Sequence, residues 1–295
     1  MASPDALTPA ETQRALRTGI AAARAAGELM RKNLRAVKKI NQASQHDIKL
    51  ELDVRCQRRI ELTLRRAFPS VPILGEEGIV GDPETGTRWV VDPIDGTVNF
   101  TYGIPHACVS IALQTKSVPR GRRASRAAGA GAGDGGFESV LGIIYDPFCN
   151  ELWTALRGQR ARLNGTLIRA SRRRRLDEAI IALGFAKERA SMDYTLPTFN
   201  GLIRRVRKIR IMGAAALSLA YVATGRMDAY LEYGLRLWDI AAGGLIVECA
   251  GGTFWRQPIG GEHTYHIRAS NQPLGAVLRE TLDGIEESGL ARFKR

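Results

Sequence analysis

Two carboxylates stand three residues apart in the segment WVVDPIDGTVNF, which covers residues 89–100. Asp92 and Asp95 would repel each other at this spacing unless a cation or a proton lies between them. Asp-Pro and Asp-Gly are also ordinary turn dipeptides, so the segment alone fits a strand that ends in a turn equally well. The other acidic residues of the chain must decide between a turn and a cation site.

Further acidic residues stand where predicted elements begin or end. Glu76 and Glu77 follow a predicted strand, and Asp53 and Asp239 stand at the starts of predicted helices. Strand ends and helix starts are usual places for ligand sites in α/β proteins. Oxygen-only ligand sets select hard cations such as Mg²⁺, and two such ions can hold the attacking and leaving oxygens of a phosphoryl transfer.

Gly96 and Thr97, directly after Asp95, suit the binding of a phosphate group. If a helix begins at this point, its first backbone N–H groups have no partner within the helix and can donate to phosphate oxygens. The carboxylates would then lie close together because metal ions lie between them. The sequence therefore favours a site for metal-assisted phosphoryl transfer.

Three motifs, GEE at 75–77, DPIDGTVNF at 92–100 and LWDIAAGG at 237–244, resemble the inositol monophosphatase family of metal-dependent, lithium-sensitive sugar phosphatases. The resemblance runs from about Ala15 to Leu274, and segments 145–165 and 213–239 are most similar to the bacterial branch. It implies a layered αβαβα sandwich of the α/β (α+β) class. It also implies a homodimeric, cytoplasmic, Mg²⁺-dependent phosphomonoesterase that acts on inositol monophosphate or a similar polyol phosphate.

The resemblance also assigns three groups of site residues. The residues that match ligands of two or three Mg²⁺ ions are Glu76, Asp92, Ile94 through its carbonyl, Asp95 and Asp239. Those that match the catalytic residues around the attacking water are Asp53, Glu76 and Thr97. Those that match contacts to the phosphate and the polyol are Asp95, Gly96, Thr97, Ala215, Glu232, Arg236 and Asp239.

The chain departs from the family pattern in three respects. Leu50 stands where a threonine is common, although Asp53 is retained. Arg236 occupies a variable position that faces the substrate in the family, so it is a candidate determinant of polyol choice. The segment 117–136, SVPRGRRASRAAGAGAGDGG, has no recognisable counterpart. Because it is poor in apolar residues, we expect a mobile excursion between two strands.

The elements that position these residues can be predicted from capping signals and hydrophobic periodicity. Thr8 to Glu11 forms a capping box, and small or apolar residues then recur at helical spacing up to Leu34. We expect a second helix over 53–68, and strands near 71–74, 88–91, 108–114, 140–145 and 151–155. Strands and helices alternate again after residue 171. These patterns predict an N-terminal α+β domain over 1–150 and a smaller C-terminal α/β domain over 151–295.

Composition excludes some classes of protein. The 295 residues are 44% hydrophobic and 25% charged, as in ordinary globular proteins, and no apolar run is long enough to span a membrane. The N-terminus lacks the pattern of a secretory signal, and four scattered cysteines predict structural thiols in a reducing cytoplasm. His263 and His266 lack partners at zinc spacing and are predicted to lie at the surface, whereas Trp238 is predicted to pack in the core.

The net charge of +13 suggests attraction to polyanions or to phosphorylated substrates. Basic residues concentrate at 116–126, 172–175 and 204–210, without the interleaved aromatic residues of a base-stacking platform. A solvated basic face and a contact with RNA or the transcription machinery both remain open. Within the phosphatase class, histidinol phosphate, fructose 1,6-bisphosphate and nucleotide 3′-phosphates remain alternative substrates.

Overall fold

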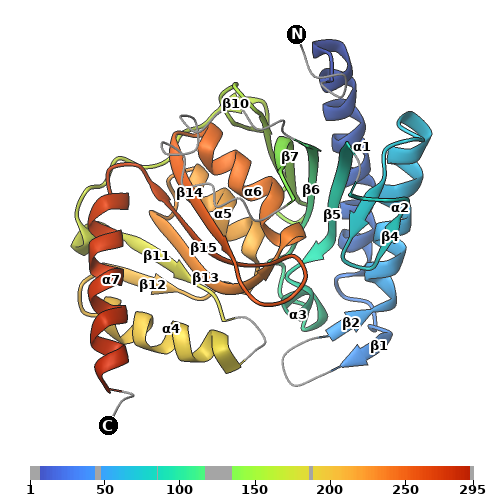
Figure 1. The fold of residues 1–295 in the computed structure, drawn as a ribbon. Coiled ribbons are helices and arrows are strands. Elements are labelled where there is room, and N and C mark those ends of the chain that lie inside the picture. The colour runs from blue at the N-terminus through green and yellow to red at the C-terminus, as the bar shows by residue number, and fades with distance from the viewer. Residues whose placement is uncertain (1–6, 44–47, 85, 117–134, 186–188, 293–295) are drawn as a thin grey trace.

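The computed structural model describes residues 7–43, 48–84, 86–116, 135–185 and 189–292. Its helices and sheets form five layers (Figure 1). The three helical layers are α1 (Pro9–Asn33) with α2 (Glu51–Ala67), α5 (Ala215–Ala223) with α6 (Leu237–Cys249), and α4 (Arg189–Leu202) with α7 (Gly275–Arg292). Two sheets lie between them, so the expected αβαβα sandwich is confirmed.

The first sheet has eight strands in the order β10-β9-β8-β7-β6-β5-β3-β4. Only β3 and β5 pair in parallel among these described strands. The strands are β3 (Ile73–Gly75), β4 (Gly78–Val80), β5 (Thr87–Asp95), β6 (Cys108–Lys116), β7 (Phe137–Asp146), β8 (Glu151–Leu156), β9 (Arg162–Leu163) and β10 (Thr166–Leu167).

The second sheet has five strands in the order β12-β11-β13-β15-β14. These are β12 (Lys208–Arg210), β11 (Ile180–Leu183), β13 (Ala229–Arg236), β15 (Thr264–Asn271) and β14 (Gly252–Pro258). Smaller elements are the pair β1 (Ile40–Ala43) and β2 (Ile48–Leu50), the short helix α3 (Thr97–Thr101) and a 3₁₀ turn at Leu176–Glu178.

The first sheet extends further along the chain than the sequence suggests. β8, β9 and β10 continue it to Leu167, although the expected boundary near residue 150 places them in the second domain. The cause is a tight turn between β7 and β8, in which Asp146 Oδ1 accepts hydrogen bonds from the N–H groups of Phe148 and Cys149. Sheet membership therefore changes between Leu167 and Ile180, and the division into two domains stays a prediction.

Apolar side chains form three cores between the layers. Trp89 and Val91 face α1 and α2, whereas Leu74 and Val90 face α5 and α6, as strand alternation requires. A third core lies between the second sheet and the outer helices α4 and α7. Helix α6 approaches β7 closely at Gly142, where a Cβ would lie 2.7 Å from a carbonyl oxygen of α6.

The first helix begins as predicted, whereas α2 begins at Glu51, two residues before the expected start at Asp53. The Thr8 hydroxyl accepts a hydrogen bond from the N–H of Glu11, whose carboxylate accepts one from the N–H of Thr8, so the capping box is present. Asp53 caps α2 in the same way by accepting from the N–H of Leu50 at 2.8 Å. None of the described helices is both long and apolar enough to cross a membrane. Most of the predicted excursion, 117–134, lies outside the described residues.

Candidate active site

A β-bulge in β5 brings Asp92 and Asp95 to the same face of the first sheet. Asp92 lies opposite Ser110 on β6, and Asp95 lies opposite Cys108, so β5 holds one extra residue between the two carboxylates. Pro93 is tolerated there because a bulge does not need its N–H. Residues three apart in a regular strand point to opposite faces. The extra residue of the bulge therefore turns the side chains of Asp92 and Asp95 to the same face of the sheet.

The shared face points toward the layer of α5 and α6. Ser110 donates to the backbone carbonyl of Trp238 in α6 at 3.1 Å, and Cys108 belongs to the core beneath these helices. Asp95 is buried and accepts hydrogen bonds from the N–H groups of Ala215 (3.0 Å) and Ala216 (2.9 Å) at the start of α5. The first turn of α5 therefore fixes the orientation of the Asp95 carboxylate.

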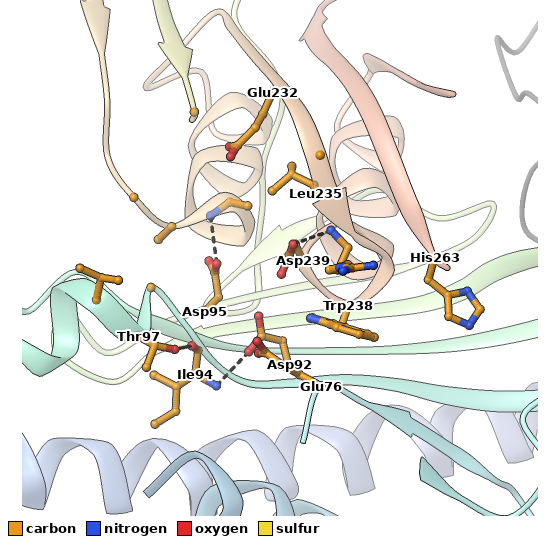
Figure 2. Close-up of a pocket in the computed structure, with 18 of the residues that line it drawn as sticks. Glu76, Asp92, Ile94, Asp95, Thr97, Glu232, Leu235, Trp238, Asp239 and His263 are labelled. Atoms are coloured by element: carbon orange, nitrogen blue, oxygen red, sulfur yellow. Dashed lines mark hydrogen bonds between the residues drawn. The ribbon is translucent and has the colours of Figure 1, made fainter. Parts of the chain in front are cut away.

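Two further carboxylates reach the same place from other elements. Asp239 lies in the first turn of α6, where its carboxylate accepts from the N–H of Arg236 at 2.7 Å. Glu76 follows β3, and its own N–H donates to the carbonyl of Val91 on the parallel neighbour β5. Figure 2 shows the carboxylates of Glu76, Asp92, Asp95 and Asp239 close together.

The acidic residues have the geometry and chemistry of a divalent cation site. Asp92, Asp95 and Asp239 can each offer an oxygen such that the three atoms lie within 4.8 Å of one another. Burial, followed by the charges of Glu76, Asp95 and Asp239, raises the pKa of Asp92 well above its ordinary value. A buried cluster of oxygen donors that repel one another fits a hard cation such as Mg²⁺.

The pKa of Asp95 shows two opposing influences. Burial raises this pKa to about 6, whereas the hydrogen bonds from Ala215 and Ala216 lower it. Because those two N–H groups stabilise the charged form, Asp95 ionises more readily than burial alone would allow. The first turn of α5 thus favours the anionic form that a cation ligand needs.

The carboxylates line a cleft of about 770 Å³ that reaches the second sheet. Glu232, on β13, forms the opposite wall and accepts a hydrogen bond from the hydroxyl of Tyr230. Burial raises the pKa of Glu232 to about 8, while that hydrogen bond lowers it. Gly184 leaves room for this arrangement, because a Cβ there would collide with the Glu232 carboxylate.

A short helix begins directly after the second carboxylate of the bulge. Gly96 precedes α3 with a φ of 90°, and a Cβ at this position would lie 2.9 Å from the carbonyl oxygen of His106. Glycine is therefore required here for conformation as well as space. The hydroxyl of Thr97 donates to the carbonyl of Ile94 at 2.8 Å. The expected helix start at Gly96-Thr97 is present.

The structure brings together all but one of the residues that the family resemblance assigns to the site. Those that line the cleft are Glu76, Asp92, Ile94, Asp95, Gly96, Thr97, Ala215, Glu232, Arg236 and Asp239. Asp53 is not among the described lining residues; it is buried at the start of α2. The role of Asp53 in water activation therefore stays a prediction.

Sequence reasoning missed several residues around the cleft. His263 and Trp238 both line it, and Trp238 also packs against the central core as predicted. The prediction of a surface position is wrong for His266, which is buried with its ring 4.4 Å from that of Tyr194 in α4. His266 lies on the face of β15 opposite Tyr265 and Ile267, and it is buried because α4 covers that face, which strand alternation alone does not reveal.

Comparison with known proteins agrees with this geometry. The model of the inositol monophosphatase family matches residues 11–121 and 136–272. The chain is 37% identical over 279 residues to the Nus factor SuhB of Pseudomonas aeruginosa, covering 90% of this chain and 95% of that protein. It is 35% identical over 247 residues to an inositol monophosphatase of Mesembryanthemum crystallinum, covering 81% and 84%. The structure of a Thermotoga maritima IMPase matches with a TM-score of 0.75 at 30% identity, covering 93% and 98%.

Proposed function

Because the chain belongs to the inositol monophosphatase family, we propose that it hydrolyses inositol monophosphate or a similar polyol phosphate with the help of Mg²⁺. The convergence of Asp92, Asp95 and Asp239 within one cleft is the observation on which this proposal rests. These residues, with Glu76 and the carbonyl of Ile94, would hold two or three ions. When Mg²⁺ is bound, its positive charge would neutralise the charge of the phosphate group.

The remaining cleft residues bind and orient the substrate. The backbone N–H groups of Gly96 and Thr97 donate to phosphate oxygens at the start of α3. Glu232 accepts from a hydroxyl of the polyol on the opposite wall. Asp53 and Thr97, together with Glu76, orient the attacking water and accept its proton. Each of these roles is part of the proposal.

The charge of the cleft supports a substrate with a single phosphate. Among the described residues that line it, Arg236 is the only arginine or lysine. Its guanidinium donates to the carbonyl of Glu262 and to the hydroxyl of Thr264, both at 2.7 Å. A second phosphate, as in fructose 1,6-bisphosphate, would need further cations. We therefore favour a neutral polyol as the leaving group, with histidinol phosphate as an alternative.

A phosphate-release panel tests the proposal. Inositol 1-phosphate, histidinol phosphate, fructose 1,6-bisphosphate and a nucleoside 3′-phosphate would be compared in Mg²⁺ and in EDTA. Asp92→Asn should lower kcat by roughly three orders of magnitude or more, because it removes a charge that the resemblance assigns to both ions. Exposed Asp193→Asn is the matched control. Near-normal release by Asp92→Asn would reject the proposed site.

Lithium inhibition follows from the same proposal. We expect Li⁺ to inhibit at millimolar concentrations by occupying one of the Mg²⁺ positions, with matched Na⁺ as the control. Full activity in roughly 100 mM Li⁺ would reject this point without rejecting phosphatase activity, because hydrolysis needs Mg²⁺ to bind and not Li⁺ to displace it. The homodimer and the cytoplasmic location stay predictions.

We propose RNA contact as a second function, on the basis of an exposed basic surface. The run 204–210 lies beside the segment that follows the run 172–175, since the N–H of Arg207 donates to the carbonyl of Ala179. Arg173 and Arg175 are engaged with Asp228 and Asp177. Seven further basic side chains are exposed there: Arg172, Arg174, Arg204, Arg205, Arg207, Lys208 and Arg210. The Pseudomonas aeruginosa relative is named a Nus factor, which agrees with a contact between such a surface and the transcription machinery.

Salt dependence separates this second function from catalysis. Binding of a labelled single-stranded RNA should weaken steeply between 50 and 200 mM salt if the surface neutralises several phosphates. Arg204→Gln with Arg205→Gln should reduce both affinity and salt slope while leaving phosphate release unchanged. Affinity that does not change in this double variant would exclude the surface as the RNA contact.

A further inference from the structure

The turn that carries Glu76 is held by a side chain from another element. Gln57 lies in α2, which runs beside β4 (Figure 1), and its side chain is buried. Its Oε1 accepts from the N–H of Glu77 at 2.8 Å, and its Nε2 donates to the carbonyl of Gly78 at 3.0 Å. One amide group therefore binds the backbone at two successive residues, immediately after Glu76.

A third hydrogen bond fixes the orientation of this amide. Nε2 of Gln57 also donates to Glu61 Oε1 at 2.9 Å, one helical turn further along α2. Both N–H groups of the amide are thereby used, and its oxygen faces Glu77. A glutamate at position 57 would lack both donors. Glutamine therefore meets the requirement of this contact, one acceptor and two donors, where an acid of the same shape would not.

The glycines on either side of the two glutamates suit the same contact. A Cβ on Gly75 would collide with the amide of Gln57, so glycine leaves the space that the amide occupies. Gly78 has a φ of 148°, a conformation that favours glycine and turns its carbonyl toward Gln57 Nε2. The motif Gly-Glu-Glu-Gly thus has a physical explanation beyond its carboxylates.

We propose that Gln57 is a positioning residue for the metal site, acting through the turn at Glu76–Gly78. The N–H of Glu76 already donates to Val91 on β5, and Gln57 holds the following two residues from the side of α2. Glu76 is thus fixed between β5 and α2 while its carboxylate faces Asp92. Residues that orient metal ligands typically change metal affinity by about 10- to 100-fold when they are replaced.

This inference rests on the proposed Mg²⁺-dependent function. The test compares Gln57→Met and Gln57→Glu with Gln114→Met. Gln114 is a buried glutamine on β6, and its Oε1 accepts a hydrogen bond from Nε of Arg88 at 2.9 Å. The Gln114→Met variant therefore shows how much stability is lost when buried amide hydrogen bonds are removed far from the turn at Glu76. Melting in EDTA, Mg²⁺ titration by calorimetry, and kcat at saturating Mg²⁺ would be measured for each variant.

Both Gln57 variants should bind Mg²⁺ about ten-fold more weakly than the wild type, or weaker still. Saturating Mg²⁺ should restore most of kcat, because the ligands themselves remain. Gln114→Met should melt at a lower temperature but bind Mg²⁺ normally. If Gln57→Met does not fold, the nearly isosteric Gln57→Glu decides the matter.

Two contrary outcomes can be distinguished. Folded Gln57 variants with wild-type Mg²⁺ affinity would overturn the positioning role and leave the phosphatase proposal intact. A wild-type protein that neither takes up Mg²⁺ nor releases phosphate would overturn the proposed function and this inference together.

Discussion

At the scale of single residues, the cleft gathers carboxylates whose charges oppose folding when no cation is bound. Burial and neighbouring acids raise the pKa of Asp92 well above its usual value, and burial raises those of Asp95 and Glu232 to about 6 and about 8. An acid with a raised pKa keeps its proton in the folded state at a pH where the unfolded chain has released it. Its contribution to stability is therefore present at low pH and lost as pH rises through the folded pKa.

Metal-free protein should accordingly lose stability between about pH 6 and pH 8.5. The folded state binds more protons than the unfolded state in this window, so the free energy of unfolding falls as pH rises. Melting in EDTA would show the decline, and saturating Mg²⁺ should flatten it because the cation replaces the protons. A melting temperature in EDTA that stays constant across this range would contradict the raised pKa values.

The buried ring of His266 affects the pH dependence of stability in the opposite direction to the buried acids. Burial, with a smaller effect of Arg268, lowers its pKa to about 3, so the folded state resists protonation below the unfolded value near 6.5. The stability from the neutral ring is lost as pH falls from 6.5 toward 3. His266→Phe should reduce the loss between pH 6.5 and 5 by roughly 2 kcal/mol, at 1.36 kcal/mol per pH unit. Urea unfolding at both pH values measures it, and parallel pH profiles of variant and wild type would refute it.

At the scale of elements, the start of the second sheet is tied to its later strands by a buried acid. Asp228 is fully buried and accepts from the N–H of Ile180 (2.8 Å), from Arg173 (3.0 Å) and from the hydroxyl of Ser171. Asn271, at the end of β15, donates to the same hydroxyl at 2.7 Å. One side chain thus joins the segment before β11 to both β13 and β15.

Asp228→Asn should destabilise the protein by about 3 kcal/mol. An amide cannot accept from all of these donors, and a buried donor without a partner is costly. Denaturant unfolding gives the free energy, and Asp177→Asn, which alters an exposed pair with Arg175, should change it little. Equal effects of the two substitutions would show that the network does not depend on the charge of Asp228.

Local signals were enough to predict many of the elements, but not β14, β15 and α7, and not all of the contacts between elements. The capping box at Thr8 and the order of the three motifs could be recognised because each depends on residues close together in the chain. The continuation of the first sheet into β8 depends on a turn at Asp146 and on pairing at a distance, which periodicity does not reveal. The contact of Gln57 with the turn at Glu77 is equally non-local, because it joins residues 20 positions apart.

At the scale of the whole molecule, the cleft lies where both halves of the layered fold meet. Asp92 comes from the first sheet, Asp239 from the helical layer between the sheets, and Glu232 from the second sheet. One apolar core packs residues of both sheets against α5 and α6, so the three parts that supply the site are held together.

Replacing 117–136 by Asn-Gly should leave kcat and KM within a few-fold of the wild type. Lys116 and Phe137 already pair across β6 and β7, so a two-residue turn can join them. Thr115 lies opposite Thr87, about 17 Å along β5 from Asp92 at ~3.3 Å per residue. Kinetics and size-exclusion chromatography would be compared side by side. A hundred-fold loss of kcat/KM, or a change of oligomeric state, would show that the segment is functionally engaged.

The bulge in β5 has a consequence for anyone who would move this site into another protein. Grafting Asp92 and Asp95 onto a regular strand at the same spacing would send one carboxylate to each side of the sheet. The transferable unit is therefore the pair of acids together with the surplus residue between them. By the same parity, deleting the codon of Pro93 would leave the two acids two residues apart and still on one face of a regular strand, but without the bend that the surplus residue puts into β5.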